Sequence, residues 1–327
     1  MAELLKANGL VKHYDSRRGI LGRITGNPGT LVQAVNGVDL SIDRGKTLGL
    51  IGESGCGKST LGRALLRLHE PTSGKVEFDG TDVTELDETA MKAMRRRMQF
   101  IFQDPYASLN PRRTVGEIVS KPLRIHKLGN ANEIRDRVVA MLDRVGLNAG
   151  HLNRYPHQFS GGQRQRIGIA RALIMRPEFV VCDEPVSALD VSIQAQIIEL
   201  LDELKRELDL TYLFISHDIS VIGYVSYRIA VMYLGRIVEE GETAEVLENP
   251  AHPYTKALLS SVPHLESSTA TSERIRLGGD LPSPVNPPPG CKFHTRCPWA
   301  SDTCKRDEPS LQSIGQNHAA ACHLASP

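Results

Sequence analysis

The chain has 327 residues, a length typical of about two domains. Its 39 lysines and arginines nearly cancel its 38 aspartates and glutamates, so no overall field would attract nucleic acid or an anionic membrane. The first residues lack the basic and apolar regions of a secretory signal, and no apolar run approaches the roughly 18 residues of a membrane span. We therefore expect a soluble cytoplasmic chain, in which disulfides are rare.

Three short apolar runs are typical of buried strands. They span residues 46–51, 179–182 and 212–215. The second run is followed at once by Asp183 and Glu184, and the third by Ser216 and His217. Because parallel strands bring their carboxyl ends to one edge of a sheet, the pattern favours a parallel sheet with a site at that edge.

The remaining stretches predict helices and a connector. Residues 58–68 predict a helix after the first strand, and residues 191–208 place apolar side chains at the spacing of a crossover helix that packs on the sheet. Residues 84–175 indicate a mostly helical, loop-rich subdomain inserted in the sheet. Residues 282–289 are so rich in proline that we expect a stiff, extended connector.

Residues 52–60, GESGCGKST, fit the phosphate-binding pattern G-x-x-x-x-G-K-[ST] between a strand and a helix. Its glycines let backbone N–H groups approach phosphate oxygens, and the following helix directs its positive end at the same anion. Lys58 supplies a charge for the β- and γ-phosphates, and Ser59 a hydroxyl for Mg²⁺. The residues predicted to bind nucleotide here are Gly52, Glu53, Ser54, Gly55, Cys56, Gly57, Lys58, Ser59 and Thr60.

Polar residues at the ends of the other two strands extend this candidate site. Asp183 is predicted to hold Mg²⁺ through its water shell, and Glu184 to polarise an attacking water. The same carboxylate pair would also fit a helix cap. His217 alone is typical of a core histidine, but together with Glu184 and the phosphate loop it indicates a catalytic role.

Residues 159–173, FSGGQRQRIGIARAL, contain a second motif, SGGQ, which resembles the signature motif of ABC-type ATPases. It stands just ahead of a helix whose first N–H groups, with the Ser160 hydroxyl, can bind a γ-phosphate. In that family the motif closes over nucleotide held by a second, head-to-tail subunit, so the resemblance implies a composite site. The four residues alone would also fit an N-cap with a glycine turn. They are Ser160, Gly161, Gly162 and Gln163.

The resemblance to ABC-type ATPases extends to three more positions. It implies that Tyr14 stacks on adenine, and that Gln103 is the Q-loop glutamine, which holds Mg²⁺ and takes part in catalysis. Residues 187–190, SALD, look like the D-loop. Because Glu184 and the signature motif are intact, we expect a subunit that hydrolyses ATP. The fold implied is α/β, a P-loop NTPase (ABC-type) sheet core with an inserted helical subdomain and a small cysteine-rich C-terminal extension.

Three longer segments look like the ATP-binding subunits of dipeptide/oligopeptide importers, specifically the subunit with an SLNPR Q-loop. They are QDPYASLNPRRTVGEIVSKPL, NPAHPYTKALLSSVP and LPSPVNPPPGCKFHTRCP. The resemblance implies an ATPase coupled to the uptake of di- and oligopeptides. Importers of nickel, glutathione and some sugars share these features, so other cargoes are alternatives. A non-transport ABC ATPase is a second alternative, disfavoured because such proteins usually carry two cassettes in one chain.

The same resemblance implies partners, a location and a division into domains. The partners are a second, related ATPase subunit, two membrane permease subunits and, indirectly, an extracytoplasmic peptide-binding protein, with no nucleic acid. The chain would lie peripherally on the cytoplasmic face of the inner or plasma membrane. Residues 1–262 would form the ATP-binding domain, with its helical subdomain at about 90–175, and residues 263–327 the connector and a cysteine-rich module.

Four cysteines gather near the end of the chain, at Cys291, Cys297, Cys304 and Cys322. Four thiolates fit either tetrahedral Zn²⁺ or an iron–sulfur cluster, and the spacing does not choose between them. The family resemblance favours a [4Fe–4S] cluster, with zinc or unliganded thiols as alternatives. Because this segment has few large apolar residues, we expect a structural staple that replaces a core, rather than a redox sensor.

Overall fold

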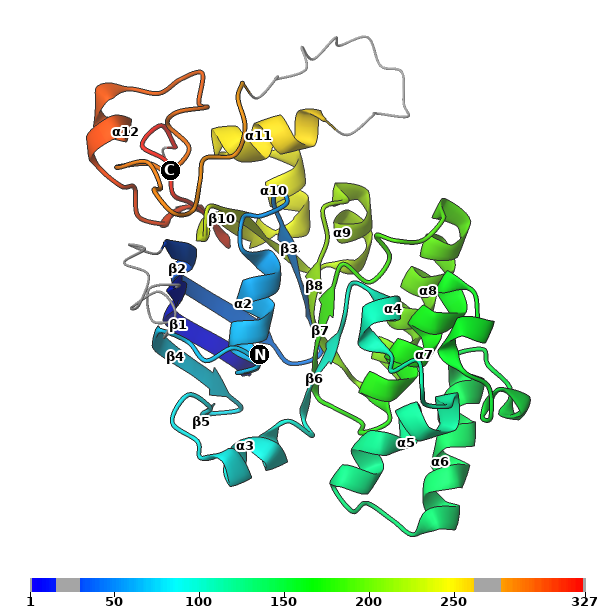
Figure 1. Cartoon of the computed structure of the whole chain (residues 1–327). Coiled ribbons are helices and arrows are strands. Elements are labelled where there is room, and N and C mark those ends of the chain that lie inside the picture. The colour runs from blue at the N-terminus through cyan, green and yellow to red at the C-terminus, as the bar shows by residue number, and fades with distance from the viewer. Residues whose placement is uncertain (1, 16–29, 262–277, 326–327) are drawn as a thin grey trace. The chain divides into compact units, whose positions relative to one another are not determined.

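The structure is a computed structural model that describes residues 2–15, 30–261 and 278–325 (Figure 1). It consists of two compact units, and each is described by itself. Unit 1 comprises Met1–Asp43, Thr47–Glu85 and Ser216–Pro327, and unit 2 comprises Arg44–Lys46 and Leu86–Ile215. The predicted domain boundary after residue 262 lies outside the described residues. Within them, no helix is both long enough and apolar enough to cross a bilayer.

Unit 1 contains an antiparallel sheet in the order β2-β1-β4-β5. Its strands are β1 (Glu3–Asp15), β2 (Leu31–Asp43), β4 (Ser73–Phe78) and β5 (Thr81–Asp82). Leu5, Leu10 and Val76 on these strands are fully buried. None of the strands predicted from the sequence lies in this sheet. Register shifts along the β1–β2 pair break the two-residue alternation that identifies a half-buried strand.

A second set of strands in unit 1 joins the middle of the chain to its C-terminal part. The strands, in spatial order, are β11 (Gln312–Gly315), β12 (His318–Ala320), β10 (Arg236–Glu242), β9 (Arg228–Tyr233) and β3 (Thr47–Ile51). The pair β3–β9 is parallel and the other pairs are antiparallel. All five residues of β3 are buried, which confirms the first predicted strand. The C-terminal segment, residues 278–325, therefore continues this sheet through β12.

The helices of unit 1 are short. They are α2 (Lys58–Leu65), α9 (Ile219–Val225), α10 (Thr243–Glu248), α11 (Pro253–Ser260) and α12 (Asp302–Arg306).

Residues 282–289 contain no helix or strand, but residues 284 and 285 form a turn, so the connector is not extended throughout as predicted.

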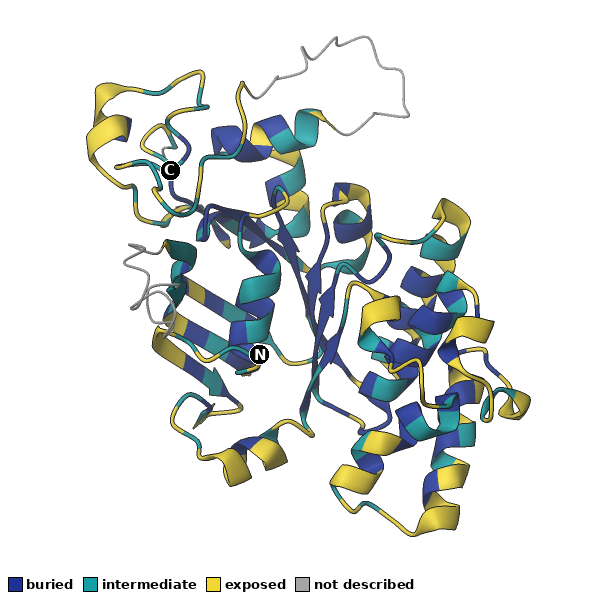
Figure 2. Cartoon of the chain, viewed as in Figure 1, coloured by how far each residue is buried: buried dark blue, intermediate teal, exposed yellow. Residues whose placement is uncertain are grey.

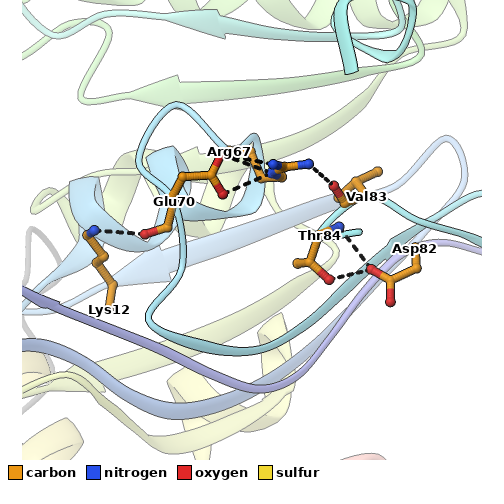
Figure 3. A network of polar contacts seen from close by, with 6 residues as sticks. All are labelled: Lys12, Arg67, Glu70, Asp82, Val83 and Thr84. Carbon is orange, nitrogen blue, oxygen red and sulfur yellow. Dashed lines mark hydrogen bonds and ion pairs between the residues drawn. The ribbon is translucent and has the colours of Figure 1, made fainter. Parts of the chain in front are cut away.

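Helix α2 ends three residues before the predicted position. Arg67 is left-handed, with φ 47°, and the Leu68 N–H donates to the Arg63 carbonyl at 2.9 Å, which is a Schellman motif. The Arg67 guanidinium donates to the Glu70 carboxylate and the Val83 carbonyl (Figure 3), which fixes the turn.

Unit 2 combines a short parallel sheet with helices. The strands, in spatial order, are β8 (Thr211–Ile215), β7 (Phe179–Asp183) and β6 (Met98–Ile101). The helices are α3 (Glu88–Met94), α4 (Pro105–Ser108), α5 (Val115–Ile125), α6 (Ala131–Arg144), η2 (Ala149–His151), η3 (Pro156–Gln158), α7 (Gly161–Leu173) and α8 (Val191–Leu208). Figure 2 shows β7 and β8 fully buried, whereas α5 and α6 carry exposed residues.

Unit 2 confirms most of the elements predicted for it. Helix α8 has the predicted bounds and buries Ile197, Leu201 and Leu204. The strands β7 and β8 match the second and third apolar runs. Strand β6 was not predicted, because its four residues lie within a stretch interpreted as helical and loop-rich.

Candidate functional site

The phosphate loop has a backbone that only glycine can adopt at two positions. Gly52 has φ 152° and Gly57 has φ 111°. A Cβ atom would lie 2.2 Å from the Met232 carbonyl oxygen at Gly52, and 2.1 Å from the Ala34 carbonyl oxygen at Gly57. Both distances are much shorter than a van der Waals contact, so a side chain at either position would clash with the backbone. The glycines of the motif are therefore required by the fold as well as by the approach of an anion.

Lys58 lies inside this loop and opens helix α2. Its side chain is buried, and its Nζ donates to the carbonyl oxygens of Gly52 at 2.7 Å and Glu53 at 3.0 Å. The N-cap residue Gly57 offers no side chain to the first N–H groups of the helix. Ser59 lies in the same first turn. An ammonium group, a glycine-lined backbone and a helix N-terminus together fit the phosphates of a nucleotide.

Glu53 is held by two residues that sequence reasoning missed. Its N–H donates to the Tyr254 Oη at 2.7 Å, and its carboxylate accepts from Arg296 Nη1 at 2.6 Å and Nη2 at 3.0 Å. These partners are 201 and 243 positions away in the chain. No local pattern signals such contacts. Cys56, in the same loop, is buried, and burial raises the pKa of its thiol.

Tyr14 lies near the end of β1 and is half-buried. Its Oη is 2.6 Å from His69 Nδ1, and the two rings meet edge to face with centroids 5.7 Å apart. Burial and the nearby Arg63 and Lys12 lower the pKa of His69, so its neutral ring can accept the Tyr14 hydroxyl. This contact fixes the orientation of the ring predicted to stack on adenine.

In unit 2 the structure brings Gln103 and Glu184 together. Gln103 Nε2 donates to Glu184 Oε2 at 2.8 Å. Asp183 is fully buried at the end of β7, and Glu184 follows in a left-handed backbone conformation with φ 43°. The Glu184 N–H donates to the Ile215 carbonyl at 3.0 Å. A strained non-glycine residue fixed in this way is a frequent feature of functional sites.

The signature motif opens helix α7. Ser160 is the N-cap: its Oγ accepts from the Gln163 N–H at 3.3 Å, while Gln163 Oε1 accepts from the Ser160 N–H at 3.1 Å. This capping box matches the simpler N-cap interpretation, and the Ser160 hydroxyl can still donate its own proton to an anion. A Cβ at Gly162 would lie 2.5 Å from Ile193 Cγ2, so glycine permits close packing of α7 against α8.

The predicted site residues divide between the two units. Unit 1 holds Tyr14, residues 52–60 and His217, which is exposed just after the sheet and precedes Asp218, the N-cap of α9. Unit 2 holds the other predicted residues. They are Gln103, Ser160, Gly161, Gly162, Gln163, Asp183 and Glu184.

The prediction of a [4Fe–4S] cluster, with zinc as its alternative, is wrong. Among the described residues, no group of three or more His, Cys, Asp or Glu side chains is arranged to hold a metal ion. All six cysteines are free thiols. Burial raises the pKa of Cys291 to about 11 and also raises the pKa of Cys297. The residues concerned are Cys291, Cys297, Cys304 and Cys322.

The C-terminal segment is anchored by packing and hydrogen bonds instead. Phe293 is 1% exposed, and its ring centroid lies 5.3 Å from that of Tyr233 and 5.5 Å from that of Tyr254. The buried Glu239 of β10 pairs with His318 of β12 at 2.8 Å. A segment with these contacts has its own attachment to a core, and the expected need for a metal staple disappears.

The chain matches two known protein families. Residues 35–187 match the family described as ABC transporter, and residues 238–304 match the family described as Oligopeptide/dipeptide transporter, C-terminal region. The chain is 50% identical to the oligopeptide transport ATP-binding protein AppF of Bacillus subtilis (strain 168), over 99% of this chain and 98% of that protein. It is 48% identical to the dipeptide transport ATP-binding protein DppF of Haemophilus influenzae, over 98% and 96%.

Solved structures show the same fold. A dimeric ATP-binding cassette in a post-hydrolysis state, bound to ADP and Pi, is 31% identical with a TM-score of 0.64, over 73% of this chain and 98% of that one. Clostridium perfringens cbiO1, part of an ABC transporter complex, gives 28% identity and a TM-score of 0.64, over 76% and 92%. The fold is that of an ABC ATPase with mixed α/β sheets. The chain therefore belongs to the ATP-binding subunits of ABC-type oligopeptide/dipeptide transporters.

Proposed function

We propose that this chain is the ATP-hydrolysing subunit of a bacterial importer that takes up di- and oligopeptides. The observation that carries this proposal is the pairing, in one chain, of an ABC transporter region with the C-terminal region of oligopeptide/dipeptide transporters. Relatives that match almost the whole chain are named as oligopeptide and dipeptide transport ATP-binding proteins. Nickel, glutathione and sugars are the alternative cargoes, and a non-transport ATPase is the less favoured alternative.

The phosphate loop supports the binding of ATP in unit 1. In this proposal Lys58 exchanges its loop carbonyl contacts for the β- and γ-phosphates, and Tyr14 stacks on the adenine. Ser59, Gln103 and Asp183 would hold Mg²⁺, which supplies positive charge that offsets the charge of the phosphates. The exchange at Lys58 is favourable because a phosphate carries more negative charge than a carbonyl oxygen.

Glu184 is the proposed general base. Its left-handed backbone and the hydrogen bond from Gln103 hold its carboxylate in a defined position, which suits the orientation and activation of a water. His217 is the proposed second catalytic residue. Gln103 is the proposed third catalytic residue, and its hydrogen bond to the Glu184 carboxylate at 2.8 Å supports this role.

The proposed partners follow from the signature motif and the family. Residues 160–163 would complete the nucleotide site of a second, related ATPase subunit, and two permease subunits would form the membrane pathway. A binding protein outside the membrane would deliver the peptide, and this chain would lie on the cytoplasmic face. The dimeric ATP-binding cassette with a similar fold supports the pairing of two cassettes.

We also propose that residues 1–262 form the ATP-binding domain, with a helical subdomain at about 90–175. Residues 263–327 would then be a connector and a C-terminal extension that docks on this domain. The pairing of β12 with β10 supports docking. Limited proteolysis that releases an intact fragment ending near residue 262 is the expected result, and initial cleavage inside β9 or β10 would contradict this division.

Reconstitution in liposomes, with both ATPase subunits, both permeases and the binding protein, tests this function. ATP should drive uptake of labelled di- and tripeptides. Glu184→Gln should retain ATP binding and lower kcat by at least about a hundredfold, because the base is lost. Glu199→Gln, an exposed change on α8, is the matched control. Uptake of nickel, glutathione or a sugar without peptide would overturn the cargo, and normal hydrolysis by Glu184→Gln would overturn the base.

A further inference from the structure

An arginine of the C-terminal segment contacts the phosphate loop. Arg296 is buried to 6% side-chain exposure, and its two terminal nitrogens form a bidentate pair with the Glu53 carboxylate at 2.6 and 3.0 Å. Glu53 itself is 28% exposed. Bidentate arginine–carboxylate pairs fix geometry as well as charge.

Each polar group of Glu53 has a hydrogen-bond partner. The Glu53 N–H donates to Tyr254 Oη, its carbonyl accepts from Lys58 Nζ, and its carboxylate accepts from Arg296. Tyr254 is fully buried in α11 and packs against Phe293, three positions before Arg296. The position of the carbonyl that holds Lys58 therefore depends on the C-terminal segment.

Charge gives the pair a second role. Glu53 places a carboxylate in a loop whose remaining features suit phosphates, and an uncompensated negative charge would repel a triphosphate. Arg296 compensates this charge from a buried position, where salt screens the interaction less than at the surface. Residues 278–297 also approach the loop elsewhere: a Cβ at Gly55 would lie 3.8 Å from Leu281 Cδ2.

We propose that Arg296 is a positioning residue for ATP binding, which orders the phosphate loop and neutralises Glu53. The C-terminal segment is then a functional part of the nucleotide site. This inference rests on the ATP binding included in the proposed function. It assigns to Arg296 a role that acts through Glu53 and makes no contact with the nucleotide itself.

The test is the dissociation constant of MgATP and of MgADP for the full chain, measured by titration calorimetry. Arg296→Met should weaken MgATP binding about tenfold, equivalent to about 1.4 kcal/mol, and MgADP binding less, because ADP carries less charge. Arg296→Lys should recover part of the loss. Glu53→Gln combined with Arg296→Met should restore affinity to within about threefold of the unchanged chain, because no carboxylate then lacks a partner.

Two controls separate this role from simple anchoring. Lys305→Ala removes an exposed ion pair with Asp302 in the same segment and should leave the MgATP affinity unchanged. Trp299, the single tryptophan of the chain, lies in this segment, so its fluorescence shows whether the segment stays docked. In about 1 M salt the deficit of Arg296→Met should shrink, because the repulsion is screened.

Three outcomes would overturn the inference. Arg296→Met could bind MgATP like the unchanged chain, so that Arg296 has no influence on the site. A loss of affinity that Glu53→Gln does not relieve, with a changed Trp299 signal, would make Arg296 a structural anchor only. Failure of the unchanged chain to bind MgATP would overturn the proposed function itself, and this result is distinguishable because it requires no variant.

Discussion

The phosphate loop and the start of helix α7 carry the two best-defined motifs of the chain, and they are supported in opposite ways. The loop depends on distant residues, since Tyr254 and Arg296 hold Glu53 from 201 and 243 positions away. Helix α7 begins with a capping box between Ser160 and Gln163, three positions apart. A motif therefore predicts its own chemistry equally well in both places, but it predicts its structural support only where that support is local.

The largest expected effect on stability comes from a distant contact in unit 1. The buried Glu239 accepts from the N–H groups of Ala251 at 2.7 Å and His252 at 2.9 Å, and it pairs with His318. Glu239→Ala would leave the buried His252 N–H and the half-buried Ala251 N–H without this acceptor. We expect the free energy of unfolding of the C-terminal segment to fall by about 3 kcal/mol. Trp299 fluorescence during urea titration measures this change.

Glu242→Gln on the same strand is the control for this experiment. Glu242 accepts one exposed hydrogen bond from Asn317 at 3.0 Å, so its replacement should cost about 0.5 kcal/mol or less. Equal, small effects of the two variants would show that the segment does not depend on the buried cluster. The contrast between distant and local support would then lose its strongest example.

A smaller effect is expected for the packing of the start of α7 against α8. Gly162→Ala would place a methyl group 2.5 Å from Ile193 Cγ2, so we expect overpacking to cost about 2 kcal/mol. Gly168→Ala, on the same helix, meets no atom within 4 Å and should gain about 0.5 kcal/mol from helix propensity. Urea denaturation followed by circular dichroism should give shifts of opposite sign. Shifts of the same sign would contradict the tight contact between α7 and α8.

Much of the fold was predictable because its signals are periodic and local. Helix α8 follows from apolar spacing over 18 residues, and β7 and β8 follow from short apolar runs that end in polar residues. The phosphate loop follows from its glycines. The sheet that contains β1 could not be predicted in this way, because its bulges interrupt the alternation along the strand.

The C-terminal segment shows where sequence reasoning fails. The spacing of its four cysteines was interpreted as a metal site, but spacing along a chain does not specify where the sulfur atoms lie. Its attachments come from Phe293, Arg296 and His318, whose partners are 39 to 243 positions away. These residues form no motif with their neighbours. Their roles are therefore recognised only in the folded structure, where their contacts with distant residues can be seen.

The smallest effect is expected from Glu178, which pairs with two distant arginines at the surface of unit 2. Arg97 Nη2 and Arg44 Nη1 donate to Glu178 at 2.9 and 2.7 Å, and they lower the pKa of Glu178 from 4.5 to about 2. Because the pKa is lowered in the folded state, the stabilisation is complete above the unfolded value of 4.5 and disappears as the pH falls through about 2. The arginines are more than a third exposed, so solvent screening limits the contribution to about 1 kcal/mol.

Glu178→Gln should therefore lower the urea midpoint of unit 2 at pH 7, and the difference from the unchanged chain should narrow steadily between pH 5 and pH 2, the range set by the two pKa values. Circular dichroism at several pH values measures this difference. If the difference in urea midpoint stays constant with pH, Glu178 acts through packing rather than charge. Glu178→Gln could instead destabilise the chain as much as Glu239→Ala does. Exposure would then not weaken a contact between distant residues, and burial would not explain why unit 1 depends on such contacts.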